Sequence, residues 1–312
     1  MADSLNETSV PISESADEIE EFDAIVIGSG VTGLYALYRM RQLGFSVRAF
    51  DDAGGVGGTW YWNRYPGCRF DSESYSYGYS FSEELLQEWD WKEHYSSQPE
   101  TERYLNYVAD KFDLRRDIQF NSRVMSATFV EEDSCWEIVL KDGSKARGQY
   151  LITSVGSFSA GYVPDFEGID SFKGITSHTR GWPAEGIDLA GKRVGVIGTG
   201  ASGVQLITEI AKEVGHLTVF QRTANYCAPL RNGPIDDETQ KQIKASYPEI
   251  FRVCMETPGS FMHEFDKRSA MDVSKEERLE QYERLWTEPG FKKWLSNFHD
   301  VMVPGEANED YA

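Results

Sequence analysis

The fold of this chain is decided by the stretch Phe22-Asp-Ala-Ile-Val-Ile-Gly-Ser-Gly-Val-Thr-Gly33. An apolar run typical of a buried strand leads directly into three glycines that have the spacing of a phosphate-binding turn. Gly28 permits the tight bend, Gly30 lets a pyrophosphate approach the backbone, and Gly33 lets the following helix pack closely on the strand. The stretch therefore predicts a strand–turn–helix unit that binds a dinucleotide.

The next residues complete this unit. Residues 33–43 carry apolar side chains at helical spacing, and residues 45–51 form a second strand that ends in Asp51. A carboxylate at this point accepts hydrogen bonds from ribose hydroxyls and repels a 2′-phosphate, so it favours FAD or NAD. We expect the N-terminus of this helix to point backbone N–H groups and a partial positive charge at the phosphates.

A second glycine turn, Gly198-Thr-Gly-Ala-Ser-Gly203, follows the apolar run at 193–197. The pattern predicts a helix at 201–214 and another strand at 217–222. Arg222 ends this strand, and an arginine there can pair with a 2′-phosphate, which selects NADP; the alternative is an ordinary surface arginine. An FAD turn followed by an NADP turn implies hydride transfer from NADPH to flavin.

Helices and strands alternate between the two turns. We expect helices at 84–91 and 100–112, and strands at 118–120, 124–130, 136–140 and 150–155. Lys141-Asp-Gly-Ser144 predicts a hairpin between the last two strands. This order suits a parallel sheet with an antiparallel addition. Tyr75, Tyr77, Tyr79 and Phe81 alternate with small residues, which predicts a half-buried strand.

The predicted fold class is α/β, with two Rossmann-like dinucleotide-binding units and an all-helical insertion. We expect a disordered acidic tail at 1–20, the N-terminal part of an FAD-binding domain at 21–165, the first part of an NADP-binding domain at 166–230, and a truncated helical subdomain at 231–312. Ser274 and Glu277 predict a helix-capping box in that subdomain. Because no further strands complete the second sheet, we expect the fold to be incomplete at the C-terminus.

Composition narrows the class of partner. The chain is 40% hydrophobic and 26% charged, as in globular proteins, and its formal net charge of −20 argues against nucleic acid or an anionic membrane as partner. No apolar run approaches the ~20 residues that span a bilayer. The four cysteines form no CxxC pair, which argues against zinc and against a dithiol redox site. We therefore expect no metal site, free thiols and a cytoplasmic protein.

Two further segments carry a family resemblance. Phe172-Lys-Gly-Ile-Thr-Ser-His-Thr-Arg-Gly-Trp-Pro183 lies between the glycine turns and resembles the signature of type I Baeyer–Villiger monooxygenases at every fixed position. The related signature of flavin-containing monooxygenases that oxidise nitrogen and sulfur ends in Tyr or Phe. The segment 57–71 resembles the GGxWxxxxYPGxxxD element of the same family. The resemblance extends over the chain after the tail and points to the phenylacetone, cyclohexanone and steroid monooxygenase branch.

The resemblance implies the cofactors FAD and NADPH and a set of residues for each. The residues expected to hold FAD are Gly28, Gly30, Val31, Thr32, Gly33, Asp51, Thr59, Trp60, Tyr61, Trp62, Asp71, Tyr77 and Val124. The residues expected to hold NADP are Arg69, Phe70, Asp71, Gly198, Thr199, Gly200, Ala201, Ser202, Gly203, Gln205, Arg222 and Thr223. Trp60 and Trp62 also suit core packing, and of the alternating aromatics only Tyr77 is expected to contact flavin.

The resemblance also implies the reaction. NADPH reduces FAD, O2 adds to give a C4a-peroxyflavin, and this attacks a ketone to give an ester or lactone. Asp71 resembles the acid that positions a catalytic arginine, and that arginine has no match in the 312 residues. His178 resembles a linker histidine, so we expect it to couple domains rather than to act as an acid or base. We expect the 312-residue chain alone to be inactive.

Three alternatives stay open. The first is a flavin-containing monooxygenase that oxygenates nitrogen or sulfur. The second is a two-dinucleotide disulfide reductase, which would need a redox cysteine pair near the flavin that the sequence lacks. The third is a non-catalytic cofactor-binding fragment. No heptad pattern or exposed apolar stripe points to a particular oligomeric state.

Overall fold

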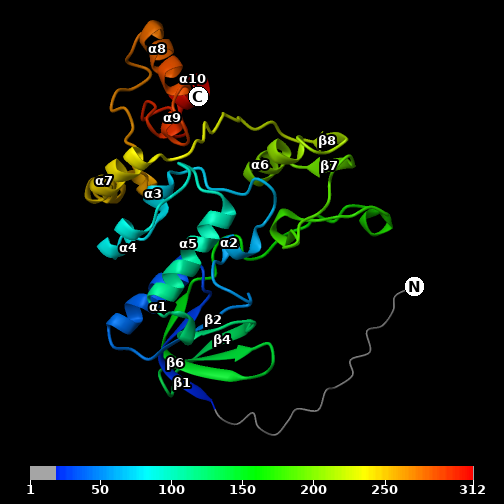
Figure 1. Cartoon of the computed structure of the whole chain (residues 1–312), viewed down its shortest axis with the longest axis vertical. Helices are drawn as coiled ribbons and strands as arrows, with labels where there is room; N and C mark the ends of the chain where they lie inside the picture. The colour runs from blue at the N-terminus through cyan, green and yellow to red at the C-terminus, as the bar shows by residue number, and fades with distance from the viewer. Residues whose placement is uncertain (1–18, 312) are drawn as a thin grey trace. The chain divides into compact units, whose positions relative to one another are not determined.

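A computed structural model describes residues 19–311 (Figure 1). The predicted acidic tail at 1–20 lies almost wholly outside the described residues. The chain divides into two compact units: residues up to Trp62 together with Leu105–Pro164 form the first, and Asn63–Tyr104 together with the residues from Asp165 onward form the second. The domain limits at 165/166 and 230/231 stay predictions.

The first unit is built on a six-stranded mixed sheet in the order β3-β2-β1-β6-β5-β4. Its strands are β1 (Glu20–Ile27), β2 (Val47–Phe50), β3 (Ile118–Gln119), β4 (Val124–Val130), β5 (Cys135–Leu140) and β6 (Lys145–Thr153). β1 pairs in parallel with β2 and β6, and β2 pairs in parallel with β3, whereas β5 is antiparallel to both β4 and β6. The parallel sheet with an antiparallel addition is thus confirmed, including the hairpin between β5 and β6.

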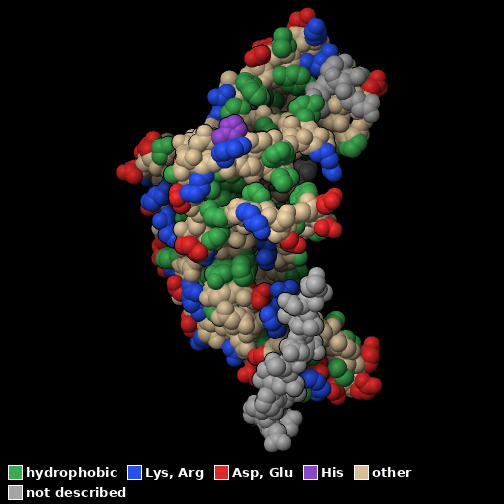
Figure 2. Space-filling model, turned by 90° about the vertical axis from the view of Figure 1, so that its right-hand side faces the viewer, with side chains coloured by type: hydrophobic (Ala, Val, Ile, Leu, Met, Phe, Trp, Pro, Cys, Tyr) green, Lys and Arg blue, Asp and Glu red, His purple; other side chains and the backbone are tan. Residues whose placement is uncertain are grey.

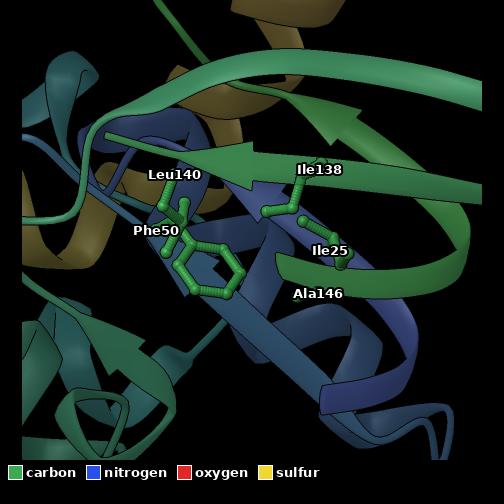
Figure 3. Close-up of a cluster of buried hydrophobic side chains, with 5 residues drawn as sticks. All are labelled: Ile25, Phe50, Ile138, Leu140 and Ala146. Carbon is green, nitrogen blue, oxygen red and sulfur yellow. The ribbon is translucent and has the colours of Figure 1, made fainter. Parts of the chain in front are cut away.

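The core of this unit joins the two halves of the sheet. Ile25 of β1 and Phe50 of β2 pack with Ile138, Leu140 and Ala146 of β5 and β6, all of them buried (Figure 3). α1 (Val31–Gln42) lies beside β1 and β2, and its buried side includes Leu34 and Leu37. Full burial of each large side chain contributes about 1.5–3 kcal/mol to stability. The core therefore fixes the strand end from which the first glycine turn leaves.

The second unit contains a small parallel sheet and several helices. The strands are β7 (Arg193–Ile197) and β8 (His216–Phe220), joined through α6 (Ala201–Ile210). The α-helices are α3 (Ser74–Tyr77), α4 (Glu83–Glu88), α7 (Asp237–Glu256), α8 (Lys275–Trp286), α9 (Lys292–Leu295) and α10 (Glu306–Tyr311). α2 (Thr59–Trp62) belongs to the first unit, and α5 (Gln98–Lys111) passes from the second unit into the first. Three-residue 3-10 turns occupy 115–117, 169–171, 179–181 and 258–260.

The helical character predicted after residue 231 is confirmed by α7 to α10. Ser274 and Glu277 form the expected capping box: the Ser274 side chain accepts from the Glu277 backbone N–H, and the Glu277 carboxylate accepts from that of Ser274. Among residues 19–311, no helix is both long and apolar enough to cross a bilayer. On the face drawn in Figure 2, hydrophobic side chains are interspersed with charged ones.

The strand expected over residues 75–81 is wrong, because residues 74–77 form the short helix α3. The alternating aromatics meet partners that are distant in sequence. Tyr75 packs on the α7 cluster around Tyr247, and the Tyr79 backbone N–H donates to the Tyr104 hydroxyl at 2.8 Å. The alternation therefore reflects separate packing sites and not one pleated surface.

Candidate dinucleotide sites

The first turn leaves no room for side chains at two of its glycines. Gly28 has φ +99°, and a Cβ added there would lie 2.6 Å from the backbone oxygen of Ser154. A Cβ on Gly33 would lie 1.9 Å from the oxygen of Gly28, so α1 can approach the turn this closely only with glycine. Gly30 caps α1, and in the described structure no side chain caps this helix and no acid lies in its first turn. These features fit a phosphate at the helix N-terminus.

Asp51 lies beside this turn, directly after β2, as predicted. Its buried carboxylate accepts hydrogen bonds from the Ser29 backbone N–H (2.5 Å), the Ser29 hydroxyl (2.6 Å) and the Ala53 N–H (2.8 Å). An ionised carboxylate offers about four acceptor positions, so these bonds leave capacity for a ribose hydroxyl. Ser29 was missed by sequence reasoning, although its place between Gly28 and Gly30 could have suggested it.

A second glycine pair covers the turn. Gly58 has φ +54°, and a Cβ there would lie 2.9 Å from the Gly30 Cα. The Gly57 N–H donates to the Ser29 oxygen at 3.2 Å, and α2 begins one residue after Gly58. The loop and the turn thus form one backbone cradle, in which added Cβ atoms would fill the space. The residues present fit a dinucleotide that lies against bare backbone.

Most of the predicted FAD residues lie in the first unit, and two lie in the second. The glycine turn, Asp51 and α2 lie within the first unit, and α2 carries Thr59, Trp60, Tyr61 and Trp62. Trp60 is buried, as a core aromatic would be, whereas Trp62 is half-buried and meets Tyr61 edge-on with ring centroids 5.1 Å apart. Val124 begins β4 and packs against the core cluster. Asp71 and Tyr77 belong to the second unit.

The second turn repeats the geometry of the first. Gly198 has φ +102°, and a Cβ on Gly203 would lie 2.5 Å from the Gly198 oxygen. Gly200 caps α6, which in the described structure has neither a side-chain cap nor an acid in its first turn. The first-turn residues of α6 include Ala201 and Ser202. This end of α6 therefore also fits a phosphate.

The end of β8 is tied to this turn. The Gln221 side-chain amide donates to the Thr199 hydroxyl at 2.8 Å, and that of Asn225 donates to the Thr199 oxygen at 2.6 Å. Arg222 and Thr223 lie next to Gln221 and are exposed. The backbone next to Arg222 is thus held near the turn, and the pairing of Arg222 with a 2′-phosphate stays a prediction.

Gln205 on α6 binds the segment 65–71. Its Oε1 accepts from the Tyr65 hydroxyl at 2.8 Å, and its Nε2 donates to the Arg69 oxygen at 2.9 Å and to the Asp71 carboxylate at 3.5 Å. A Cβ on Gly67 would lie 2.7 Å from the backbone oxygen of Gln205. Burial raises the pKa of Asp71, and the Gln205 hydrogen bond and the Arg69 charge offset part of this effect.

Arg69 and Phe70 are also fixed by nearby groups. The Arg69 guanidinium donates to the Glu93 carboxylate at 3.3 Å and to the Tyr95 oxygen at 3.2 Å. Phe70 is buried and stacks on Tyr77, with ring centroids 4.2 Å apart and planes at 13°. Arg69 and Phe70, which are expected at the NADP site, are thus held by contacts within the protein.

His178 lies in a mostly exposed segment between the two turns. Its Nδ1 accepts from the Arg180 backbone N–H at 3.2 Å, which caps the 3-10 turn at 179–181. It lines a surface groove together with neighbouring residues, among them Ile175 and Pro183. Its predicted role in domain coupling stays a prediction.

Comparison with known proteins identifies the family. The model of the family "Flavin-binding monooxygenase-like" matches residues 23–229. Cyclohexanone 1,2-monooxygenase from an Acinetobacter species is 45% identical, over 92% of this chain and 53% of the relative. A phenazine N-monooxygenase from Lysobacter antibioticus is 42% identical, over 92% of this chain and 53% of the relative. The chain thus spans about half the length of these relatives.

A solved structure agrees with the sequence comparisons. The oxidised steroid monooxygenase bound to NADP superposes with a TM-score of 0.89 at 47% identity, over 93% of this chain and 55% of that one. Because the family model covers more than half of the chain and these similarities accompany the 172–183 signature, the resemblance inferred from sequence is confirmed. The chain belongs to the flavin-binding monooxygenase-like family and, within it, to the type I Baeyer–Villiger monooxygenases.

Proposed function

We propose that this chain supplies the FAD and NADPH sites of a Baeyer–Villiger monooxygenase, which inserts one oxygen atom of O2 beside a ketone carbonyl to give an ester or lactone. The observation that carries the proposal is the pair of glycine turns. Each lies at the N-terminus of a helix that has no side-chain cap in the described structure, and they are followed by Asp51 in one unit and by Arg222 in the other. Bound flavin would accept the hydride of NADPH and activate O2.

The FAD residues would act mainly through backbone. The first turn of α1 and the Gly57–Gly58 loop present main-chain groups to the pyrophosphate, and Asp51 accepts from a ribose hydroxyl. Ser29 would keep the Asp51 carboxylate beside the turn through the two hydrogen bonds that it donates. The residues of α2, Thr59–Trp62, together with Val124, would complete the cofactor contacts proposed from the resemblance.

The NADP residues would combine a helix N-terminus with a cation. α6 presents the N–H groups of its first turn to the pyrophosphate, while Arg222 pairs with the 2′-phosphate. Gln221 and Asn225 hold the Arg222 segment near the turn through Thr199. Gln205, proposed as an NADP residue, would act at least in part by holding the segment 65–71 against α6.

Asp71 would orient a cation that stabilises developing negative charge during oxygen transfer. Its carboxylate is half-buried, and Gln205 and Arg69 limit the effect of that burial on its pKa. O2 and a ketone are the proposed partners. The part of the family that supplies the catalytic arginine has no counterpart among residues 1–312, so we propose that this chain alone forms no product.

N-oxygenation is the second candidate activity. A phenazine N-monooxygenase is 42% identical to this chain, so the cofactor sites alone are compatible with oxygen transfer to nitrogen. The ending Trp182-Pro183 of the linker signature favours the ketone reaction, because the related signature of nitrogen- and sulfur-oxidising enzymes ends in Tyr or Phe. A cofactor-binding fragment without catalysis is the third candidate.

Assays of two polypeptides separate these candidates. The 312-residue chain, and the same chain extended to the length of its relatives, are each supplied with FAD, NADPH and either cyclic ketones or an aromatic N-heterocycle. Lactone from the extended chain alone supports the proposal, and N-oxide without lactone supports the second candidate. Lactone from the 312-residue chain would refute its proposed inactivity. FAD and NADP binding without product in both polypeptides would leave the cofactor-binding fragment as the function.

A further inference from the structure

A buried acid–base pair lies two residues beyond Asp71. The Glu73 carboxylate Oε1 is 2.7 Å from His263 Nε2, and the two side chains are only 5% and 9% exposed. The Tyr95 hydroxyl donates to the same Oε1 at 3.3 Å. Among the described residues, Glu73 Oε2 has no hydrogen-bond partner. A carboxyl group that is this deeply buried needs hydrogen-bond partners, and among the described residues the His263 contact is its shortest side-chain contact.

His263 is the hydrogen-bond partner closest to the Glu73 carboxylate. The other titratable groups that face this carboxylate are the hydroxyls of Tyr75 and Tyr95 and the thiol of Cys254, and none of them carries positive charge. Burial and the nearby Glu73 charge raise the pKa values of Tyr75 and Tyr95, which therefore stay neutral. Removal of the imidazole would leave a carboxylate in the interior with a single weak donor.

Glu73 fixes the chain directly after the segment 69–71, which is proposed to contact NADP. Its backbone oxygen accepts from the Ser76 N–H at 3.1 Å and from the Ser76 hydroxyl at 2.9 Å, so Glu73 is the N-cap of α3. The Ser74 N–H donates to the His94 oxygen at 2.7 Å. The backbone two and three residues after Asp71 is therefore fixed by hydrogen bonds.

His263 is itself held by the helical subdomain. It follows α7 through a turn in which the Thr257 hydroxyl donates to the Val253 oxygen at 3.1 Å and also contacts the Phe261 oxygen. The neighbouring Met262 packs on the α7 cluster that also contacts Tyr75. The imidazole thus connects the subdomain to the start of α3.

We propose that Glu73 and His263 are positioning residues for Asp71. Gln205 holds Asp71 from α6, and the Glu73–His263 pair holds the following residues from the helical subdomain, so the segment is fixed on both sides. The helical subdomain would then help to set the geometry of the NADP site, although it contributes no residue to the glycine turn. The inference rests on the proposed NADP site but concerns a contact that exists without cofactor.

Hydrogen exchange on the 312-residue chain tests the contact itself. In His263→Leu, we expect backbone amides of residues 69–76 to exchange about ten-fold faster, the size expected when one coupling contact is lost. Amides of β1 and β6 should be unaffected. His299→Leu is the matched control, because His299 is an exposed histidine of the same subdomain. Unchanged exchange at 69–76 in His263→Leu would overturn the proposal.

A variant that removes both polar side chains separates positioning from folding. Glu73→Leu/His263→Leu leaves no unpaired carboxylate, so its melting temperature should recover relative to His263→Leu. We expect fast exchange at 69–76 to persist, because the directional contact is still missing. Recovery of slow exchange together with stability would show that the pair only fills space, and would overturn the proposal.

A double-mutant cycle with Asp71 tests the coupling to the NADP site. NADP⁺ affinity is measured by calorimetric titration for the parent, His263→Leu, Asp71→Asn and the double variant. If His263 acts through Asp71, we expect His263→Leu to weaken binding about ten-fold in the parent and to have no further effect once Asp71 is replaced. Additive losses would overturn the proposal. If the parent binds no NADP⁺, the proposed NADP site fails, and the exchange experiments still decide whether the pair orders residues 69–76.

Discussion

Asp71, which is proposed to orient a cation, has an environment that makes a testable prediction about pH. Burial raises its pKa above the usual 3.8, so the folded chain binds this proton more tightly than the unfolded chain. The protonated form contributes stability that is present at low pH and is lost as pH rises through the raised folded pKa. At neutral pH the ionised carboxylate therefore lowers the free energy of unfolding, which is a cost consistent with a functional group.

Replacement of Asp71 by Asn should raise the melting temperature at pH 7 and leave it nearly unchanged at pH 3.5. The amide keeps an oxygen that accepts from Gln205 but carries no charge to bury. Thermal unfolding is followed by circular dichroism at both pH values. Gln205→Leu serves as a comparison, because it removes the hydrogen bond and should destabilise the chain. Equal shifts for Asp71→Asn at both pH values would contradict the assigned role of charge burial.

Arg222 is predicted to determine which dinucleotide binds at the second turn. Arg222→Gln removes the cation expected to face the 2′-phosphate, and a hydrogen bond to a charged group contributes about 1.5–3 kcal/mol. NADP⁺ affinity should fall by at least ten-fold while NAD⁺ affinity stays the same. Calorimetric titration with both dinucleotides measures the two values. Arg193→Gln is the control, since this arginine begins β7. A parallel loss for NAD⁺ would point to general destabilisation.

At the scale of elements, the two glycine turns can be tested against each other. Gly33→Ala and Gly203→Ala each place a methyl group against the backbone oxygen of the first glycine of the same turn. Because each helix must then move away from its strand, overpacking should cost about 1–3 kcal/mol and displace the phosphate site. We expect Gly33→Ala to reduce FAD content selectively and Gly203→Ala to reduce NADP⁺ affinity selectively.

The measurements are flavin absorbance after gel filtration and NADP⁺ titration, with each variant serving as the control for the other. Loss of both cofactors in both variants would contradict the assignment of one cofactor to each turn. Gly44→Ala gives a further comparison, since Gly44 also has positive φ but an added Cβ there meets nothing within 4 Å. It therefore reports backbone strain without a steric clash.

Elements whose signals are local were predictable from sequence. β1, α1 and β2 follow from the periodicity and glycine spacing of residues 22–51, and the capping box of α8 follows from Ser274 and Glu277. The predicted strand at 75–81 failed because its aromatic pattern arises from contacts with Tyr247 and Tyr104, far along the chain. Short-range periodicity cannot distinguish a pleated strand from aromatics that pack into separate sites.

The residues proposed for the candidate site divide in the same way. Glycines, Asp51 and Arg222 have fixed positions relative to their own strands, so spacing identifies them. The roles of Gln205 and of the Glu73–His263 pair depend on residues 134 and 190 positions away. Contacts between residues so far apart produce no periodic pattern in a single sequence, so they are seen only in the tertiary structure.

At the scale of the whole molecule, the division into units is not a division of the sequence into two halves. The chain leaves the first unit after Trp62, returns at Leu105, and leaves again after Pro164. The segment Asn63–Tyr104 therefore lies in the same unit as the residues from Asp165 onward. Within the second unit it is hydrogen-bonded to Gln205, Asn232 and His263.

This arrangement predicts that the two fragments of a chain cleaved near residue 173, between the two glycine turns, stay associated. A site-specific protease sequence inserted after Lys173, which is exposed, should allow complete cleavage. We expect the two fragments to separate on a denaturing gel and to elute together in gel filtration. Separate elution of the cleaved fragments under native conditions would contradict the importance of these hydrogen bonds.

Residues 63–104 belong to the second unit but lie between two parts of the first unit in the sequence. This order limits where two related chains could be recombined. A gene fusion or exchange that joins two relatives at residue 165 would transfer the second turn and α6 but leave behind the segment 63–104, which is hydrogen-bonded to Gln205 of α6. A chimera would thus need two matched junctions, near 63 and 104, in addition to the one at 165. Because the chain passes between the two units three times, recombination at a single junction cannot exchange one unit intact.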